Sequence, residues 1–327
     1  MNGNGHTQQV LDLAEEELRS LKKQNDDVEL LPIIGLAQVS DPEIEARKEK
    51  IKWDLIRRVG SEEEFGKRVG EIIRAAVDYV VDAPTLSRYS IYELEPDEKT
   101  AIGKRIERLL RFEFNLPKGE KLDIKLAGEE VDIKTTMGKN WMFSKSSHGH
   151  MNLLIAYDEK RAVFQLGIAY VLASHLGAHN RDEKQSLKAA HRETIYWILN
   201  NHPYPPNFFD NLPEHLFKII VTEKTGMKRV MQLLRLAPGK PIPRHVICSV
   251  ANQKDPLRRI RSNGGARDIL WGEGMLVLSG AYECDRKIAE PEIGRVLKDD
   301  EILTLRMQDL NLPTKLLDGY KAWHQLS

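Results

Sequence analysis

The sequence has little cysteine, no long apolar run and no net charge, and each deficit excludes a class of protein. Its 327 residues hold only Cys248 and Cys284, too few for a disulfide framework or for a zinc site made of cysteines alone. No apolar run reaches the roughly 18 residues of a membrane-spanning helix. Residues 1–6 lack the charged and apolar regions of a secretory signal. We therefore expect a cytoplasmic protein.

The zero net charge conceals an uneven distribution of charge. Lys and Arg together number 49, as do Asp and Glu. Residues 224–267 contain eleven Lys and Arg and a single acid, Asp255, which gives a net charge of +10, whereas residues 1–100 carry −8. A basic block of this size favours a polyanion-binding surface, because each phosphate contact releases counterions. A solvated basic helix face would have the same composition, so charge alone does not decide.

The length is sufficient for two domains, and the periodicity indicates mixed α/β structure. We expect a helical extension over 1–45, further helices over 41–81, and a helix from Asp97 that ends before Pro117. Three prolines within 202–207 predict a linker, because proline resists both helices and sheet ladders. Other expected elements are strands at 151–157, 162–166 and 275–279 and helices near 227–236, 245–251 and 255–261.

Residues 122–135 alternate with a period of two and predict a β-hairpin with its turn at 127–130. Paired residues share a face of the sheet, so Asp123, Asp132 and Lys134 should converge on one surface. Glu107, on the preceding helix, could reach over the hairpin. This turn predicts three facing pairs: Leu126 with Val131, Lys125 with Asp132, and Asp123 with Lys134.

Three carboxylates and a lysine suit phosphodiester hydrolysis. Carboxylates can hold Mg²⁺, which stabilises charge on the phosphate and acidifies a bound water. A lysine can orient that water or neutralise the scissile phosphate. The alternative is a half-exposed hairpin whose charges pair with one another on the solvent face.

The basic block has the order of a helix-turn-helix with a wing. Residues 242–261 predict two short helices joined near Asn252 and Gln253, followed by a loop and a strand. The loop glycines would let the backbone approach phosphates closely. The alternative is an exposed helix that never meets DNA. The residues expected to face DNA are Lys254, Arg258, Arg259, Arg261, Asn263, Gly264, Gly265 and Arg267.

Four segments resemble the PD-(D/E)xK nuclease superfamily and, within it, the NaeI family of type II restriction endonucleases. The resemblance spans roughly 78–280. One departure is Ile133, where the family's namesake has cysteine; the strand pattern predicts that this side chain faces the core. The segments are 111–114, 127–134, 176–182, and 259–270 with Glu273 and Gly274.

The resemblance implies an endonuclease domain over 46–201, a linker at 202–207 and a winged-helix DNA-binding domain over 208–327. It places the family's active-site and metal-binding acids at Glu107, Asp123 and Asp132 and its lysine at Lys134. Asn180 and Arg181 lie in a matching segment and either contact DNA or cap a helix. The family further implies Mg²⁺, double-stranded DNA, a homodimer, activation by a second DNA site, and a methyltransferase acting on the same sequence.

Two other functions remain open at this stage. A repair nickase acting at mismatches or lesions would cut one strand per encounter, whereas a restriction enzyme cuts both. A non-catalytic winged-helix transcription regulator would bind specific DNA without cleaving it in Mg²⁺. A methyltransferase encoded beside this protein would favour restriction over both.

Overall fold

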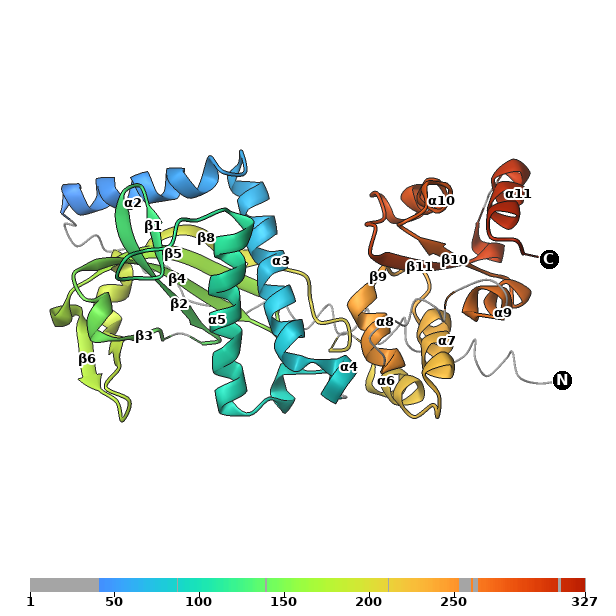
Figure 1. Ribbon diagram of the computed structural model, residues 1–327, viewed down its shortest axis with the longest axis horizontal. Helices are drawn as coiled ribbons and strands as arrows, with labels where there is room; N and C mark the ends of the chain where they lie inside the picture. The colour runs from blue at the N-terminus through green and yellow to red at the C-terminus, as the bar shows by residue number, and fades with distance from the viewer. Residues whose placement is uncertain are drawn as a thin grey trace. The chain divides into compact units, whose positions relative to one another are not determined.

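A computed structural model describes residues 41–86, 88–138, 140–210, 212–252, 260, 264–310 and 313–326 (Figure 1). The described chain divides into two compact units. The N-terminal unit contains 41–80 and 94–207; the C-terminal unit contains 81–93 and the residues from Phe208 onward. Of the expected extension over 1–45, residues 1–40 lie outside the described residues, and the remainder begins the first described helix. None of the described helices is long and apolar enough to cross a membrane.

The N-terminal unit is built on a five-stranded sheet in the order β1-β2-β4-β5-β8. β2 and β4 are parallel, whereas the other neighbours are antiparallel. A smaller antiparallel sheet has the order β3-β7-β6. The strands are β1 (Ile124–Leu126), β2 (Glu129–Thr136), β3 (Met142–Phe143), β4 (His150–Asp158), β5 (Val163–Val171), β6 (Leu176–His179), β7 (Gln185–Leu187) and β8 (Tyr196–Pro203).

Three helices pack on this sheet: α2 (Pro42–Ile56), α3 (Glu62–Val81) and α5 (Pro96–Glu113). α5 lies along β2, and α2 contacts β1, β5 and β8. Pro96 occupies the first turn of α5 after a capping box formed by Glu95 and Glu98. The helix ends at Glu113, ahead of Pro117 as predicted. Its inner face carries Ile102, Ile106 and Leu110, all buried.

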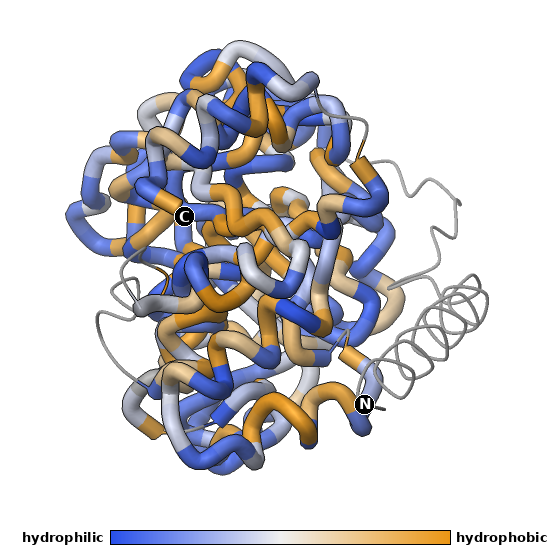
Figure 2. Tube along the Cα trace, turned by 90° about the vertical axis from the view of Figure 1, so that its right-hand side faces the viewer, coloured by the Kyte–Doolittle hydropathy of each residue, from blue (hydrophilic) through white to orange (hydrophobic). Residues whose placement is uncertain are grey.

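The central strands β4 and β5 are mostly apolar because both of their faces are covered. Seven consecutive residues of β4, 151–157, are buried. At the smaller sheet, Trp141 belongs to a separate cluster of buried apolar side chains. Its indole N–H donates to the Ile155 carbonyl at 3.0 Å. Along the helices, hydrophobic and hydrophilic residues alternate, as expected of elements with one buried face (Figure 2).

The β1–β2 hairpin has a loop of two residues where the sequence predicts a turn of four, so its register differs by two residues. Its loop is Ala127–Gly128, both with positive φ (49° and 84°), a tight turn whose twist matches the strands. The observed register pairs Ile124 with Val131 and Leu126 with Glu129, so the predicted four-residue turn and its facing pairs are wrong. A shift of two residues preserves the faces, so Asp123 and Asp132 still share one surface. Ile133 is buried as predicted.

The predicted linker is partly a strand. β8 continues through His202 and Pro203, which lie opposite Phe164 and Val163, so the expectation that these residues resist a sheet ladder is wrong. β8 is an edge strand, and an edge tolerates proline because one side of its backbone needs no partner. Tyr204 is buried and donates its hydroxyl to Glu159 Oε2 at 2.6 Å. The two compact units divide after Asn207.

The C-terminal unit combines short helices with a three-stranded antiparallel sheet in the order β10-β11-β9. Two helices and one strand form where the sequence predicts them: α7, α8 and β10. α9 was not predicted, because the glycines around it mask its short apolar pattern. The elements are α4 (Ala83–Leu86), η1 (Ile91–Glu93), α6 (Glu214–Val221), α7 (Gly226–Leu236), β9 (Ile242–Pro243), α8 (Arg244–Ala251), α9 (Ala266–Gly272), β10 (Met275–Ser279), α10 (Glu283–Ile293), β11 (Glu301–Arg306) and α11 (Thr314–Trp323).

Candidate active site

Asp123 and Asp132 face each other across the start of the β1–β2 hairpin. Asp123 immediately precedes β1, and the register of Ile124 with Val131 brings it opposite Asp132. The Ile133 N–H donates to Asp123 Oδ2 at 2.7 Å and fixes that carboxyl against the neighbouring strand. Asp132 is only 5% exposed, and Asp123 is half-buried. Two carboxyls this close in a poorly solvated place cannot both ionise freely.

The pair shares a proton. Burial, the hydrogen bond to Asp132 and the nearby charges of Asp132 and Glu107 raise the pKa of Asp123 to about 7. Burial also opposes ionisation of Asp132, but hydrogen bonds from Asp123, Lys134 and Ser147 outweigh it and hold the pKa of Asp132 below its ordinary value. The dyad therefore holds one proton below about pH 7, and that proton belongs to the pair.

Lys134 lies two residues beyond Asp132 on the same face of β2. Its ammonium Nζ is 2.6 Å from Asp132 Oδ2, and its side chain is 19% exposed. This contact confirms that Asp132 and Lys134 lie on the surface where Asp123, Asp132 and Lys134 were predicted to converge. It is also an ion pair of the kind expected for a hairpin whose charges only pair with one another, although Asp132 is buried and not on an open solvent face.

Ser147 completes the surroundings of Asp132, and sequence reasoning missed it. Its hydroxyl, fully buried, donates to Asp132 Oδ2. Ser147 belongs to the short 3₁₀ helix η2 (Lys145–Ser147) ahead of β4, and the parallel pairing of β2 with β4 places that segment beside Asp132. Asn152 secures the segment by donating its amide to the carbonyls of Ser147 and His150. Because Ser147 follows Asp132 by 15 residues, no local pattern in the sequence indicates that the two are in contact.

Glu107 lies on α5, half-buried and close enough for its charge to raise the pKa of Asp123. It does not close a ready-made cage with the two aspartates. Among the described residues, the one set of three candidate ligands with atoms within 4.8 Å of one another is Cys284, Asp285 and His324. That set lies in the C-terminal unit and was not predicted.

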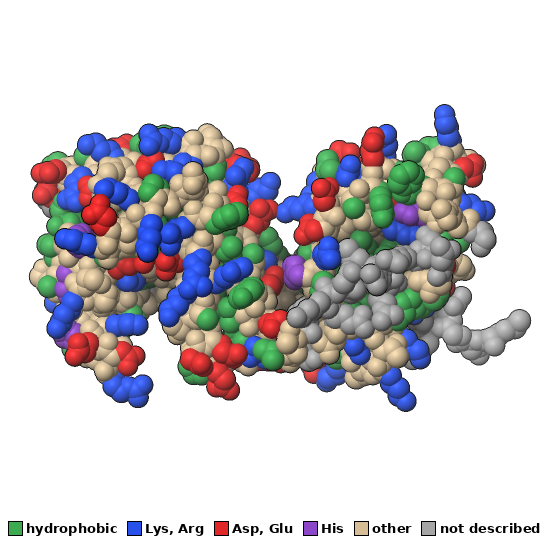
Figure 3. All heavy atoms as spheres, viewed as in Figure 1, with side chains coloured by type: hydrophobic (Ala, Val, Ile, Leu, Met, Phe, Trp, Pro, Cys, Tyr) green, Lys and Arg blue, Asp and Glu red, His purple; other side chains and the backbone are tan. Residues whose placement is uncertain are grey.

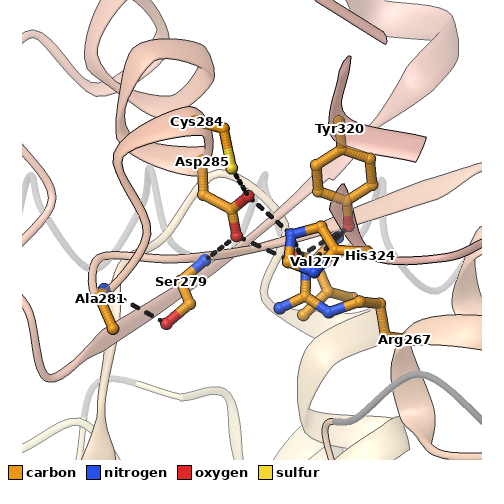
Figure 4. Close-up of polar contacts among 8 residues, drawn as sticks. All are labelled: Arg267, Val277, Ser279, Ala281, Cys284, Asp285, Tyr320 and His324. Atoms are coloured by element: carbon orange, nitrogen blue, oxygen red, sulfur yellow. Dashed lines mark hydrogen bonds and ion pairs between the residues drawn. The ribbon is translucent and has the colours of Figure 1, made fainter. Parts of the chain in front are cut away.

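The Cys284–Asp285–His324 set is a buried charge network and not a metal site (Figure 4). The Arg267 guanidinium stands among its ligand atoms, 3.5 Å from Asp285 Oδ2 and 2.9 Å from His324 Nε2, and also donates to Tyr320 at 3.0 Å. A fixed cation there repels a metal ion. Burial and the Asp285 charge raise the pKa of Cys284 to about 11, so the thiol keeps its proton and ligates poorly.

This network corrects the prediction for Arg267. The side chain is 4% exposed and points into the C-terminal unit, so it does not face DNA. Two more cations of the basic block also have internal roles. Arg229 donates to the carbonyls of Glu223, Val250 and Ala251, and Arg235 forms a two-bond ion pair with Glu273. The surface charge of the block is therefore lower than its sequence suggests.

The other predicted DNA-binding residues fall into two groups. Asn180 and Arg181 lie at the exposed tip of the β6–β7 hairpin; Asn180 Oδ1 accepts from the N–H groups of Asp182 and Lys184, so it caps a turn and not a helix. The Arg181 side chain is 97% exposed. Gly264 is exposed, whereas Gly265 is buried at the start of α9. Lys254, Arg258, Arg259, Arg261 and Asn263 lie outside the described residues.

Two comparisons with known proteins agree with each other. The profile of the family described as "Restriction endonuclease NaeI" matches residues 54–314. The "Type II restriction enzyme NaeI" of Lentzea aerocolonigenes is 32% identical over 232 residues, which cover 68% of this chain and 73% of that protein. The profile match contains Glu107, Asp123, Asp132, Lys134 and Ser147, and it extends through most of the C-terminal unit.

Proposed function

The chain belongs to the restriction endonuclease NaeI family, and from this membership we propose that it is a type II site-specific deoxyribonuclease that hydrolyses double-stranded DNA with Mg²⁺. The observation that carries the proposal is the Asp123–Asp132 pair, with the Lys134 ammonium 2.6 Å from Asp132 Oδ2. All three residues belong to one hairpin within the segment that the family profile matches. Buried, mutually hydrogen-bonded acids beside a lysine are a costly arrangement for a fold and a useful one for phosphoryl chemistry.

The donor set suits a hard divalent cation. Asp123 and Asp132 offer carboxylate oxygens, and the charge of Glu107 reaches Asp123, which makes Glu107 the third acid of the proposed site. Mg²⁺ typically takes one or two carboxylates and keeps several waters, so a compact three-acid cage is not required. When bound, the cation would supply Lewis-acid stabilisation of the phosphate and a more acidic water.

The protein's own groups have separable roles in this proposal. To ligate a cation, Asp123 would have to release the shared proton, because a ligating carboxyl must be ionised. Lys134 keeps an ammonium at the edge of the site, where it can neutralise the scissile phosphate or orient the attacking water. Ser147 holds the Asp132 carboxylate in one rotamer and touches no substrate, which makes it a positioning residue.

We further propose that the two units are a PD-(D/E)xK nuclease domain and a winged-helix domain. The succession α7, β9, α8, α9, β10, α10, β11, with strand order β10-β11-β9, supports a winged helix in which α10 joins the last two strands. In that arrangement α9 takes the place of the second helix of the helix-turn-helix, and the basic residues 254–261 precede it. The division after Asn207 supports the expected boundary, with 81–93 added to the second domain.

A homodimer is part of the same proposal, because cutting both strands of a palindromic site requires two centres related by a two-fold axis. Activation by a second DNA site bound at the C-terminal domain, and a partner methyltransferase protecting the same sequence, follow from family membership and are proposed on that ground.

The test is cleavage of phage and plasmid DNA by the purified chain in Mg²⁺, with the ends mapped by sequencing. Double-strand ends at one short sequence support the proposal, and Asp132→Ala and Lys134→Ala should each lower the rate at least 100-fold while duplex binding persists. Nicks confined to mismatches would favour the repair enzyme. Specific binding without any Mg²⁺-dependent cut would favour the regulator.

A further inference from the structure

One face of α5 carries three cations that have no ion-pair partner in the part of the chain that the structure describes. Lys104, Arg108 and Arg111 are spaced i, i+4 and i+7, so they form a stripe along the helix. Lys104 and Arg108 are exposed; Arg111 is half-buried, and its Nε lacks a hydrogen-bond partner. Within the described residues none of the three forms an ion pair or a hydrogen bond, whereas Arg105, on the neighbouring face, stacks 4.0 Å over the ring of Tyr79.

The stripe borders the carboxylate pair. Glu107 belongs to the same helix face, at ion-pair spacing from Lys104 and Arg111, and its charge reaches Asp123. α5 packs on β2 with Gly103 close to Thr135, one residue beyond Lys134. Figure 3 shows Lys and Arg side chains gathered over α5 next to acidic ones. The cations therefore stand beside the site where a phosphate would react.

Unpaired like charges at i, i+4 destabilise a helix, so the stripe has no structural benefit on its own. A polyanion lying across it would remove that repulsion and release counterions. In Figure 3 the β6–β7 hairpin and α5 project on either side of an open notch. Arg181, at the tip of that hairpin, supplies a cation on the other side.

We propose that Lys104, Arg108 and Arg111 form a phosphate track that holds the backbone of the DNA strand being cut against the Asp123–Asp132 pair. The ligand is the phosphodiester backbone flanking the scissile bond, contacted without regard to base sequence. The inference rests on the proposed nuclease function and deepens it by naming how the substrate strand is held. A planar guanidinium suits two-point contact with phosphate, and a lysine acts as a point charge.

The test uses the full chain and the variants Lys104→Gln, Arg108→Gln, Arg111→Gln and their triple combination. Duplex binding is measured by fluorescence anisotropy without metal over a range of salt concentrations, and cleavage is measured in Mg²⁺. The triple variant should bind with a slope of log K against log salt that is less negative by about 2–3, because each lost contact removes about 0.9. KM should rise at least tenfold, a larger change than in kcat. Lys160→Gln, an exposed cation at the β4–β5 turn, is the matched control and should leave both quantities unchanged.

A double-mutant cycle that combines a change in the DNA with a change in the protein locates the contact. Neutral methylphosphonates placed one to three positions from the mapped cut should weaken binding by wild type but have little further effect on Arg108→Gln, because the two changes remove the same contact. Equal methylphosphonate penalties in both proteins, or an unchanged salt slope in folded single variants at the exposed Lys104 and Arg108, would overturn the track while leaving the nuclease assignment intact. A wild-type chain that neither binds nor cuts duplex DNA would instead overturn the proposed function, and the track with it.

Discussion

At the scale of single residues, the central feature is a carboxyl pair that keeps one proton at neutral pH. Hydrogen bonds from Ser147 and Lys134 as well as from Asp123 hold the pKa of Asp132 low, whereas burial raises the pKa of Asp123. Types and spacing in the sequence predicted Asp123, Asp132 and Lys134 as a group. Ser147 could not be predicted, since its contact depends on the parallel pairing of β2 with β4 across a long connection.

Ser147→Ala should weaken Mg²⁺-supported cleavage by 10- to 100-fold, the usual cost of removing a group that orients a metal ligand. The loss should appear as a higher Mg²⁺ concentration at half-maximal rate, because Asp132 is no longer held in one rotamer. Ser146→Ala, on the exposed side of the same turn, is the control and should behave as wild type. Identical Mg²⁺ dependence in the two variants would show that the Ser147 hydroxyl has only a packing role.

The shared proton also predicts a pH dependence of metal binding. With the pKa of Asp123 raised to about 7, the proton is present below pH 7 and must leave when a cation binds. Apparent Mg²⁺ affinity should therefore fall by up to tenfold for each unit between pH 7 and about pH 5, and level off above pH 8. Calorimetry in two buffers of different ionisation heat measures the released protons. A release near zero at pH 6 would contradict the assignment of the proton to the site.

At the scale of elements, the hairpin shows both the reach and the limit of sequence patterns. Period-two alternation located both strands. The prediction of which residues share a face remains correct despite a two-residue error in register, because faces repeat every two residues. The turn was predicted at the right place but two residues too long, because Ala127 adopts a positive φ that alanine rarely takes. The Asp54 carboxylate on α2 supports it by accepting the Ala127 N–H at 2.7 Å, a contact that no local pattern reveals.

Asp54→Ala should lower the free energy of unfolding by about 2 kcal/mol, the scale of hydrogen bonds to a charged group. Burial opposes the charge of Asp54, yet the Ala127 N–H, Arg57 and Arg58 hold its pKa below the ordinary value. The contribution is therefore complete above about pH 4 and disappears as the pH falls through the folded pKa, so the variant and wild type should converge in acid. Denaturant unfolding at pH 7 and pH 3 measures this. Arg57→Ala, whose side chain is 72% exposed, should cost less than about 0.5 kcal/mol; an equal loss in both variants would show that the turn contact is not responsible.

At the scale of the whole molecule, acids elsewhere in the same unit balance the basic block at 224–267, and three of its cations have partners inside the protein. Arg229 and Arg267 bind backbone carbonyls and a buried network, and Arg235 pairs with Glu273, so these cations are less available to DNA than the sequence suggests. Composition could not distinguish these cations from exposed ones, because burial is decided by tertiary packing. The remaining cations, together with the α5 stripe in the other unit, give each unit its own candidate contact with DNA.

If the C-terminal unit binds a second DNA site that activates the first, cleavage of a one-site plasmid should be slow, and a short duplex carrying another site should accelerate it in trans. Coupling of 1–3 kcal/mol corresponds to a 5- to 150-fold change, so the acceleration should fall in that range. Arg259→Ala combined with Arg261→Ala should abolish the acceleration, because both changes remove cations from the basic block. Arg57→Ala combined with Lys67→Ala, two exposed cations of the other unit, serves as the charge-matched control. The measurement is initial cleavage rate against added duplex, with each protein's rate on the one-site plasmid as its own reference. Equal rates on one-site and two-site DNA in wild type, with no response to the duplex, would mean that the C-terminal unit only tethers the substrate, and the contact made by the α5 stripe would then be the one that brings DNA to the carboxylate pair.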